Sequence, residues 1–120
     1  MIIRCQTIQI SQVLVNLLSN ALDAVRNQSE EWVKMQAEDR GSHIEMRISD
    51  VGPGIPPEVA DKLMTPFFTT KPPGQGTGLG LSIAQLIISE HGGTLTLDRS
   101  APNTSFVISL PKAQEMRNAA

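Results

Sequence analysis

The stretch Gly74-Gln75-Gly76-Thr77-Gly78-Leu79-Gly80 carries a glycine at every second position and runs directly into the apolar segment Leu81-Ser82-Ile83-Ala84. Alternating glycines do not hold a packed strand or helix, because each loses the most backbone freedom on ordering and supplies no side chain. The run ends at a predicted helix start, where free N–H groups and the positive end of the helix dipole favour an anion such as phosphate. We therefore expect an anion-binding loop rather than a flexible linker, which would combine glycine with serine.

The spacing of these glycines differs from that of two common phosphate loops. The sequence has no G-x-x-x-x-G-K-[ST] pattern, and the run does not fit G-x-G-x-x-G either. No predicted strand leads directly into it, as a Rossmann turn requires. The loop therefore belongs to neither the Walker nor the Rossmann class.

The composition is that of one ordinary globular domain. The 120 residues are 40% hydrophobic and 18% charged, with a formal net charge of −2. This length supports one core, so we expect a single domain over residues 1–120. A charge so close to zero gives no general attraction to nucleic acid or to a membrane surface.

Cysteine content and hydropathy indicate a cytoplasmic location. Cys5 is the only cysteine, which excludes an internal disulfide and fits a reducing compartment. No apolar run is long enough to span a bilayer, and the first residues lack a signal-peptide pattern. A longer parent protein could still be anchored in a membrane.

Periodicity predicts two long helices and one short one. Apolar residues recur at three- and four-residue spacing from Ile8 to about Arg26, and again from Leu81 to His91, where Gly92 and Gly93 end the helix. Pro57 to Leu63 fits a short helix. The apolar face expected for the first helix comprises Ile10, Val13, Leu14, Leu17, Leu18, Ala21, Leu22 and Val25.

Strict alternation predicts three strands. Residues 44–50 alternate and stop at a Gly- and Pro-rich loop, and residues 94–98 and 104–110 form a hairpin joined by residues 99–103. Residues 27–42 are polar and irregular, and we expect part of them to continue as helix until Gly41. Met1 to Cys5 would supply part of a further strand.

This order of elements predicts an α+β fold, a two-layer α/β sandwich whose mixed, mostly antiparallel sheet is covered on one face by helices. The segment from residue 65 to residue 80 has no periodicity, and a stretch this long without structure in a compact domain is usually functional, often a lid. Residues 111–120 are expected to fray as a polar tail.

Three polar residues on the first helix are candidates for binding. Asn16 and Asn20 lie four residues apart and therefore project from one face, and Asp23 extends the same stripe. A solvated helix face is the plain alternative, but asparagine has no helix propensity that would explain two copies within the helix. Side-chain amide oxygens are hard ligands that suit Mg²⁺.

Asp50 ends a predicted strand just before Gly52 and Gly54. Its carboxylate can accept a hydrogen bond from an exocyclic amine such as that of adenine, while the two glycines let a ring approach the backbone. An ordinary turn-starting aspartate is an equally good explanation of this residue alone.

Lys71 follows two adjacent phenylalanines, Phe67 and Phe68, in the long loop. The two rings need a burial site, so the loop must dock on the domain or on a partner. Lys71 would then reach a phosphate as a point charge, although a solvated lysine is nearly as good an explanation. His43 and His91 have no cysteine or carboxylate neighbours at ligand spacing, so the sequence does not favour zinc as a cofactor.

Taken together and in order, these segments resemble the ATP-binding catalytic domain of sensor histidine kinases, within the superfamily that also contains gyrase, heat-shock chaperone and mismatch-repair ATPases. Residues 12–21 resemble the N box and Asp50-Val51-Gly52-Pro53-Gly54-Ile55 the G1 box. Residues 66–71 are similar to the F box and residues 76–81 to the G2 box. The F-box wording most resembles kinases of the nitrogen-regulation and oxygen-sensing type. The fold that the resemblance implies is the Bergerat ATP-binding fold, with residues 57–76 as a short ATP lid.

The resemblance implies a role for each matching residue. Asn20, with Asn16, would hold the Mg²⁺ that bridges the ATP phosphates, and Asp50 would bind the adenine amine. Asn16, Asn20 and Lys71 make up the catalytic set. The cofactor-binding set comprises Asn20, Asp23, Asp50, Gly52, Gly54, Ile55, Lys71, Gly76, Thr77, Gly78, Leu79, Gly80 and Thr104.

The sequence departs from the family pattern at three places. Asn103 stands where the family often has glycine, next to Thr104, the expected adenine contact. Asp23 stands where many members have lysine, which removes one phosphate contact. The family usually has a fuller strand before the N box, so the start is expected to be clipped.

The function implied is transfer of the γ-phosphoryl group of Mg-ATP to a histidine. Neither His43 nor His91 lies in the helical context that the family uses for its acceptor, so the acceptor histidine is expected on a separate dimerisation domain of the same parent protein. A response regulator would act downstream. The parent is expected to be homodimeric and this chain alone monomeric, with little or no ATP hydrolysis of its own.

Two alternatives share the same fold. An ATPase switch of the gyrase or chaperone class usually has a glutamate at the Asn16 position to activate water, and asparagine cannot act as a base. A protein serine kinase of the same fold would differ in the stability of its phosphorylated product. A module without nucleotide binding is the least favoured reading, because all the motif residues are present.

Overall fold

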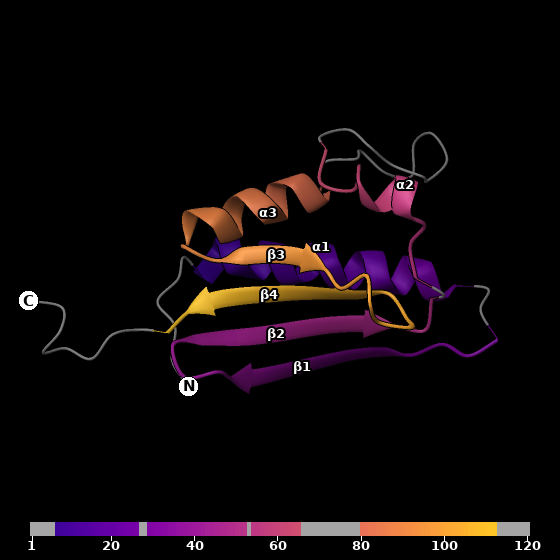
Figure 1. Cartoon of the computed structure of the whole chain (residues 1–120), viewed down its shortest axis with the longest axis horizontal. Helices are drawn as coiled ribbons and strands as arrows, with labels where there is room; N and C mark the ends of the chain where they lie inside the picture. Colours follow the sequence, from indigo (N-terminus) through magenta and orange to yellow (C-terminus); the bar gives the residue numbers. More distant parts are fainter. Residues whose placement is uncertain (1–6, 27–28, 53, 66–79, 113–120) are drawn as a thin grey trace, which may run out of the picture.

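The computed structural model describes residues 7–26, 29–52, 54–65 and 80–112 (Figure 1). The described residues form three helices and four strands, which follow one another in the order α1, β1, β2, α2, α3, β3, β4. The predicted α+β class is confirmed.

Helix α1 spans Thr7–Val25 and agrees with the predicted helix within one residue at each end. Its buried stripe consists of Ile10, Val13, Leu17, Ala21 and Val25. Leu14 and Leu18 pack against this core from the side. Leu22 was expected in the apolar face but is 56% exposed, because it lies beyond the edge of the stripe that meets the sheet.

Helix α2 covers Pro57–Ala60, and proline suits its first position, since an N–H there would have no partner in the helix. Helix α3 covers Gly80–Glu90. Its end is marked by Gly92, whose φ is +78°, and by the Gly93 N–H, which donates to the Ile88 carbonyl at 2.9 Å. This is the left-handed glycine stop predicted from the sequence.

The four strands are β1 (Val33–Asp39), β2 (His43–Asp50), β3 (Thr94–Leu97) and β4 (Ser105–Pro111). They form one sheet in the order β1-β2-β4-β3. All three pairings among these strands are antiparallel, so the described part of the sheet contains no parallel pair. The predicted hairpin of the last two strands is confirmed.

Strand β1 corrects the prediction for residues 27–42, which anticipated helix. The strand pairs with β2 from Val33 opposite Asp50 to Asp39 opposite Ile44. It is exposed on both faces except at Val33, which is partly buried, so the sequence shows no alternation of apolar and polar residues. Gly41, with φ +92°, lies in the tight turn that joins β1 to β2, rather than ending a helix.

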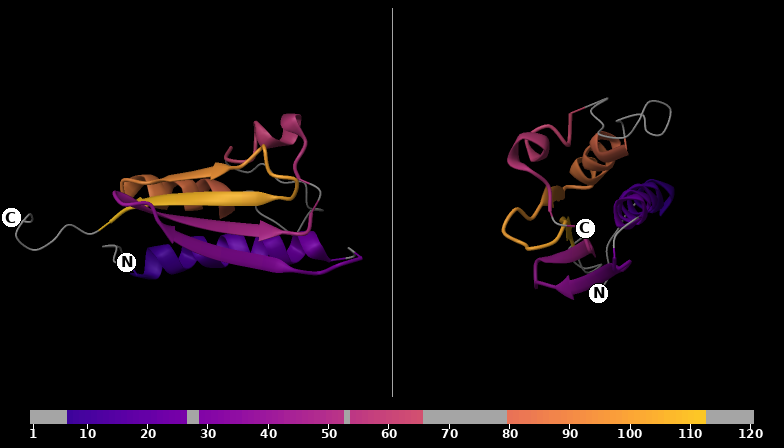
Figure 2. Two further views of the ribbon diagram at one scale, coloured as in Figure 1. Left: turned by 60° about the horizontal axis from the view of Figure 1, so that its bottom comes forward. Right: turned by 90° about the vertical axis from the view of Figure 1, so that its right-hand side faces the viewer.

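The core lies between the sheet and the two long helices, which cover the same face (Figure 2). From the sheet it takes Ile48, Leu95, Phe106, Ile108 and Leu110, and from α3 it takes Ala84, Ile87 and Ile88. The sheet's other face carries polar groups such as Arg47, whose Nη1 lies 2.8 Å from Asp98 Oδ2. The predicted two-layer arrangement is therefore confirmed.

Strand β4 continues into the segment predicted as a frayed tail. Pro111 pairs with His43, and the Lys112 N–H donates to the Ser42 carbonyl at 3.2 Å. Residues 113–120 lie outside the described residues, as do Met1 to Cys5 and residues 66–76 of the predicted lid. Among the helices that the structure describes, none has the length and apolar character of a membrane span.

Candidate functional site

Asp50 ends strand β2 with its carboxylate turned inward and is only 4% exposed. The Gly52 N–H donates to Asp50 Oδ1 at 2.7 Å. Burial raises the pKa of the Asp50 carboxyl, and the Gly52 hydrogen bond opposes this rise only in part. A buried carboxylate with one protein donor keeps acceptor capacity for a further donor.

The loop after Asp50 is joined to the start of β4 by backbone hydrogen bonds. The Asp50 N–H donates to the Thr104 carbonyl at 3.0 Å, and the Thr104 N–H donates to the Gly52 carbonyl at 3.3 Å. A Cβ atom added to Gly52 would lie 2.7 Å from Asp50 Oδ1 and 3.1 Å from Thr104 Oγ1. The structure thus brings together three residues of the predicted set: Asp50, Gly52 and Thr104.

Gly54 and Ile55 continue this loop toward α2. Gly54 has φ +93° and open space around it, so glycine is required there by backbone conformation rather than by crowding. Ile55 packs partly buried against the core. Beyond α2, Asp61 Oδ1 accepts from Arg99 Nη2 at 2.7 Å, which links this segment to the β3–β4 connection.

Asn16 joins helix α1 to the start of α3. Its Nδ2 donates to the Gly80 carbonyl at 3.1 Å, and its Oδ1 accepts from Gln12 Nε2 at 2.8 Å. The structure therefore brings the N-box residue Asn16 to Gly80, the last glycine of the alternating run. The contact with Gln12 was not foreseen, although its i, i+4 spacing makes it readable from the sequence.

Asn20 and Asp23 follow Asn16 along α1, and both are partly buried. Asp23 Oδ1 lies 3.6 Å from Arg26 Nη2. An aspartate with its own cation partner is a poor substitute for a phosphate-binding lysine. Lys71 and residues 76–79 of the predicted site lie outside the described residues.

The donor set of this region suits a hard cation. Amide oxygens of Asn16 and Asn20 match Mg²⁺, which takes few protein ligands and retains several waters. In the described part of the chain no three histidine, cysteine or acidic side chains cluster as a metal site would need.

The described parts of the site face the same side of the molecule. In Figure 1 the end of β2, the start of β4 and the start of α3 are the right-hand ends of these elements. The start of α3 therefore faces the same side as the end of β2, where Asp50 lies.

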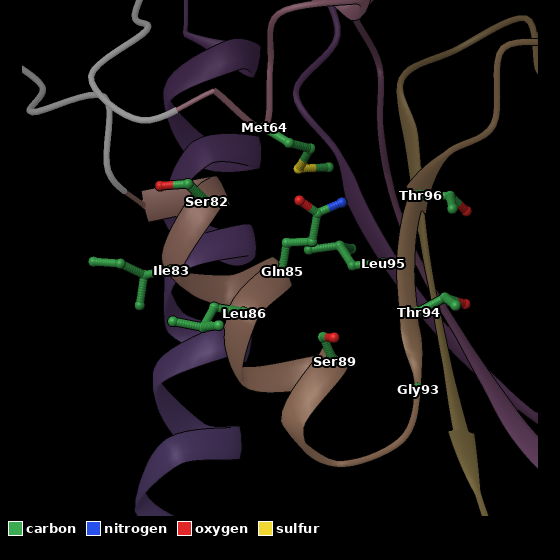
Figure 3. A pocket seen from close by; sticks show the side chains of 10 residues that line it. All are labelled: Met64, Ser82, Ile83, Gln85, Leu86, Ser89, Gly93, Thr94, Leu95 and Thr96. Atoms are coloured by element: carbon green, nitrogen blue, oxygen red, sulfur yellow. The ribbon is translucent and has the colours of Figure 1, made fainter.

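An open groove of about 630 Å³ lies elsewhere, between α3 and β3 (Figure 3). Its lining carries no charged side chain and none of the predicted site residues. The lining residues are Met64, Ser82, Ile83, Gln85, Leu86, Ser89, Gly93, Thr94, Leu95 and Thr96. A groove without charges is not suited to a triphosphate, so it is not part of the candidate site.

Comparison with known proteins shows the class to which this domain belongs. Residues 5–114 match the family of histidine kinase-, DNA gyrase B- and HSP90-like ATPases. The chain therefore belongs to this family, membership of which implies nucleotide binding. The predicted resemblance is confirmed.

Curated relatives are sensor kinases. The C4-dicarboxylate transport sensor protein DctB of Rhizobium meliloti is 39% identical over 106 residues, which cover 88% of this chain and 17% of DctB. The sensor protein FixL of Bradyrhizobium diazoefficiens is 41% identical over 110 residues, which cover 90% of this chain and 21% of FixL. The chain thus spans about a fifth of the length of these relatives.

Solved structures give the same result. The nucleotide-free catalytic domain of the histidine kinase ThkA matches with a TM-score of 0.80 and 38% identity, over 92% of this chain and 70% of that one. ThkA in complex with the response regulator TrrA matches with a TM-score of 0.74 and 32% identity, over 92% of this chain and 30% of that one. The catalytic-domain fold predicted from the sequence is confirmed.

Proposed function

We propose that this chain binds Mg-ATP and presents its γ-phosphoryl group to a histidine on a separate helical dimerisation domain of the parent protein. A response regulator would then receive the phosphoryl group. Family membership and the sensor-kinase relatives support this proposal. The histidine kinase ThkA, which is similar in structure, has been solved in complex with a response regulator.

The observation that carries the proposal is the buried Asp50 carboxylate beside Gly52 and Thr104. A carboxylate accepts hydrogen bonds and cannot donate them when ionised, so it favours the 6-amino group of adenine over the 6-oxo group of guanine or hypoxanthine. Gly52 has no Cβ, which leaves the backbone accessible to a flat ring. Thr104 Oγ1 supplies a second polar group at the same place.

Asn20, together with Asn16, would hold Mg²⁺ between the helix and the phosphates. The Asn16 amide contacts the Gly80 carbonyl and Gln12 Nε2. The resemblance to the family gives Asn20 as the principal ligand. A bound Mg²⁺ supplies neutralisation of the phosphate charge that develops during transfer. Lys71 and the backbone N–H groups of residues 76–80 would bind the same phosphates.

In this mechanism the chain contributes binding, orientation and charge neutralisation. Phosphoryl transfer needs little covalent chemistry from the protein, and correct placement of donor and acceptor accounts for much of the rate. The nucleophilic histidine and its base belong to the acceptor domain. Because Asn16 cannot act as a base, hydrolysis of ATP by the chain alone should be very slow.

The remaining parts of the proposal concern the setting of the domain. We place residues 57–76 in a lid over the nucleotide and expect the chain alone to be a monomer in the cytoplasm. The parent would act as a homodimer, with no nucleic-acid partner. Size-exclusion chromatography with light scattering tests the oligomeric state of the chain and of the parent.

The decisive experiment incubates the chain with radiolabelled Mg-ATP and a matching helical acceptor domain. Acid-labile, alkali-stable phosphate on the acceptor is expected, and an acceptor with its histidine replaced by glutamine should remain unlabelled. ATP binding without transfer to several such acceptors would count against a histidine kinase. Alkali-labile, acid-stable product would indicate a serine kinase, and rapid hydrolysis without acceptor would indicate an ATPase switch.

A further inference from the structure

Asn103 lies in the connection between β3 and β4, and its side chain reaches the loop after Asp50. Nδ2 donates to the Val51 carbonyl at 3.4 Å and to the Gly52 carbonyl at 3.3 Å. Asn103 is itself partly buried. One amide group therefore contacts two consecutive peptide carbonyls of the loop.

The first of these carbonyls belongs to the peptide unit that also contacts Asp50. The Val51 carbonyl and the Gly52 N–H are the two ends of one trans peptide group, so they point in opposite directions. The carbonyl end accepts from Asn103, and the N–H end donates to Asp50 Oδ1 at 2.7 Å. The orientation of this peptide plane is thus held from both sides.

Rotation of that plane would move the donor away from the buried Asp50 carboxylate. The carboxylate would lose the hydrogen bond that fixes its Oδ1 and would be free to turn. The backbone bond between the Thr104 N–H and the Gly52 carbonyl holds the next peptide unit, not this one. Among the described residues, Asn103 is therefore the side chain that holds the carbonyl end of the Val51–Gly52 peptide, opposite Asp50.

We propose that Asn103 is a positioning residue for adenine recognition, holding the Asp50 carboxylate in the orientation that accepts the adenine amine. This inference rests on the proposed ATP-binding function. It also explains a departure from the family pattern, since glycine at this position has no side chain to donate.

The direction of the hydrogen bonds gives a sharp test. Asn103→Ala removes the donor, and Asn103→Asp keeps the shape but places a carboxylate against two carbonyl oxygens, which repel it. A role in packing alone predicts that Asn103→Asp is the milder change. The positioning role predicts that it is the more severe one.

The experiment compares binding of ATP and inosine triphosphate, which lacks the 6-amino group, by calorimetry at millimolar Mg²⁺. The wild-type preference for ATP should fall about threefold to tenfold in Asn103→Ala, the loss expected for one hydrogen bond, and further in Asn103→Asp. Affinity for inosine triphosphate should change little. An unchanged preference in both variants would overturn the proposal.

Ser100→Ala is the matched control in the same connection. The Ser100 hydroxyl donates to Asp98 Oδ1 at 2.6 Å and is the chief cause of the lowered pKa of Asp98, about 2, but it does not contact the Asp50 loop. Its nucleotide preference should equal that of the wild type. A reduced preference for ATP in Ser100→Ala would show that general loosening of the β3–β4 connection causes the effect, and not the loss of the Asn103 contact.

A second measurement separates this inference from the proposed function. The exchange rate and chemical shift of the Gly52 amide proton report its bond to Asp50 without any nucleotide. We expect faster exchange and a shifted resonance in Asn103→Ala and Asn103→Asp. If the wild type does not bind ATP but the Gly52 amide responds, the proposed function fails and the positioning contact stands; an unchanged amide would refute the contact.

Discussion

The ionised Asp50 destabilises the folded state, because a carboxylate that is 4% exposed must lose most of its hydration. Burial raises the pKa of its carboxyl in the folded protein. Below about pH 4 an aspartate is protonated in both the folded and the unfolded chain, so burial then carries no charge. As the pH rises through the raised pKa, the folded protein gains a buried charge that the unfolded chain exposes, and the free energy of unfolding falls.

Asp50→Asn should therefore raise the free energy of unfolding at pH 7 but not near pH 3. The amide oxygen can still accept from the Gly52 N–H, so the local contact survives the change. Urea unfolding of wild type and variant at both pH values measures the difference. A difference that is the same at both pH values would show that charge burial is not its cause.

The same variant should bind ATP about 10- to 100-fold more weakly, the range expected on losing a hydrogen bond to a charged group. A more stable protein with weaker binding would separate the role of Asp50 in function from its role in folding. Calorimetric titration gives the affinity. Wild-type affinity in Asp50→Asn would exclude Asp50 as the adenine acceptor.

Alanine substitutions at Gly52 and Gly80 should have different effects on stability. A Cβ on Gly52 would lie 2.7 Å from Asp50 Oδ1, whereas the nearest atom to a Cβ on Gly80 is Asn16 Cγ at 3.9 Å. Gly52→Ala should cost about 1–3 kcal/mol in stability and abolish nucleotide binding, because the added methyl forces the carboxylate aside. Gly80→Ala should leave stability within about 0.5 kcal/mol of the wild type. Equal effects of the two changes on urea unfolding would contradict this assignment.

A helix or strand could be predicted from the sequence when it buries one face and exposes the other. Helix α1 and strands β2 and β4 each bury one face against the core, so their periodicity is visible in the sequence. Strand β1 lies at the edge of the described sheet with both faces open to solvent, and its composition was mistaken for irregular or helical chain. The stabilising partner of β1 is the backbone of β2, which leaves no pattern in side chains.

The candidate site also contains some contacts that the sequence predicts and others that it does not. Asp50 and Gly52 were predicted from their place at the end of a strand, and Thr104 was predicted only from the resemblance to the family. The contacts of Asn103 and of Asn16 depend on the approach of the β3–β4 connection and of the α3 start, which are distant in sequence. Only the departure of Asn103 from the family glycine marked it in advance, and its role required the path of the backbone.

The joint between α3 and β3 depends on two adjacent glycines for different reasons. A Cβ on Gly93 would overlap the Ser109 carbonyl oxygen of β4, whereas Gly92 has room but needs φ +78°. Gly93→Ala should cost about 3 kcal/mol or more, because the helix cannot then meet the sheet at this distance. Gly92→Ala should cost about 1–2 kcal/mol, the penalty of a left-handed backbone for alanine. Urea unfolding of both variants checks the order, and a milder effect at Gly93 would show that the joint can move apart.

For the molecule as a whole, nucleotide binding and folding should be coupled, because the site joins segments from distant parts of the chain. The end of β2, the connection before β4, and the contact between α1 and α3 all belong to it. A ligand that binds only when these segments are assembled stabilises the folded state by mass action. At a free concentration 100 times its dissociation constant the gain is about 2.7 kcal/mol.

Saturating Mg-ATP should accordingly raise the unfolding temperature by roughly 8–14 °C, given about 3–5 °C per kcal/mol for a domain of this size. Chelation of Mg²⁺ by EDTA should remove most of the shift, because the triphosphate then meets the site without its counter-charge. Asn20→Ala should lose the Mg²⁺-dependent part and retain the Mg²⁺-independent part, whereas Asp50→Asn should reduce both parts, since adenine recognition does not involve the metal. Differential scanning fluorimetry over a nucleotide titration measures all three proteins. If the temperature shift of Asn20→Ala still depends fully on Mg²⁺, the metal ligand does not lie on α1. The result for Asp50→Asn would still test whether Asp50 binds adenine.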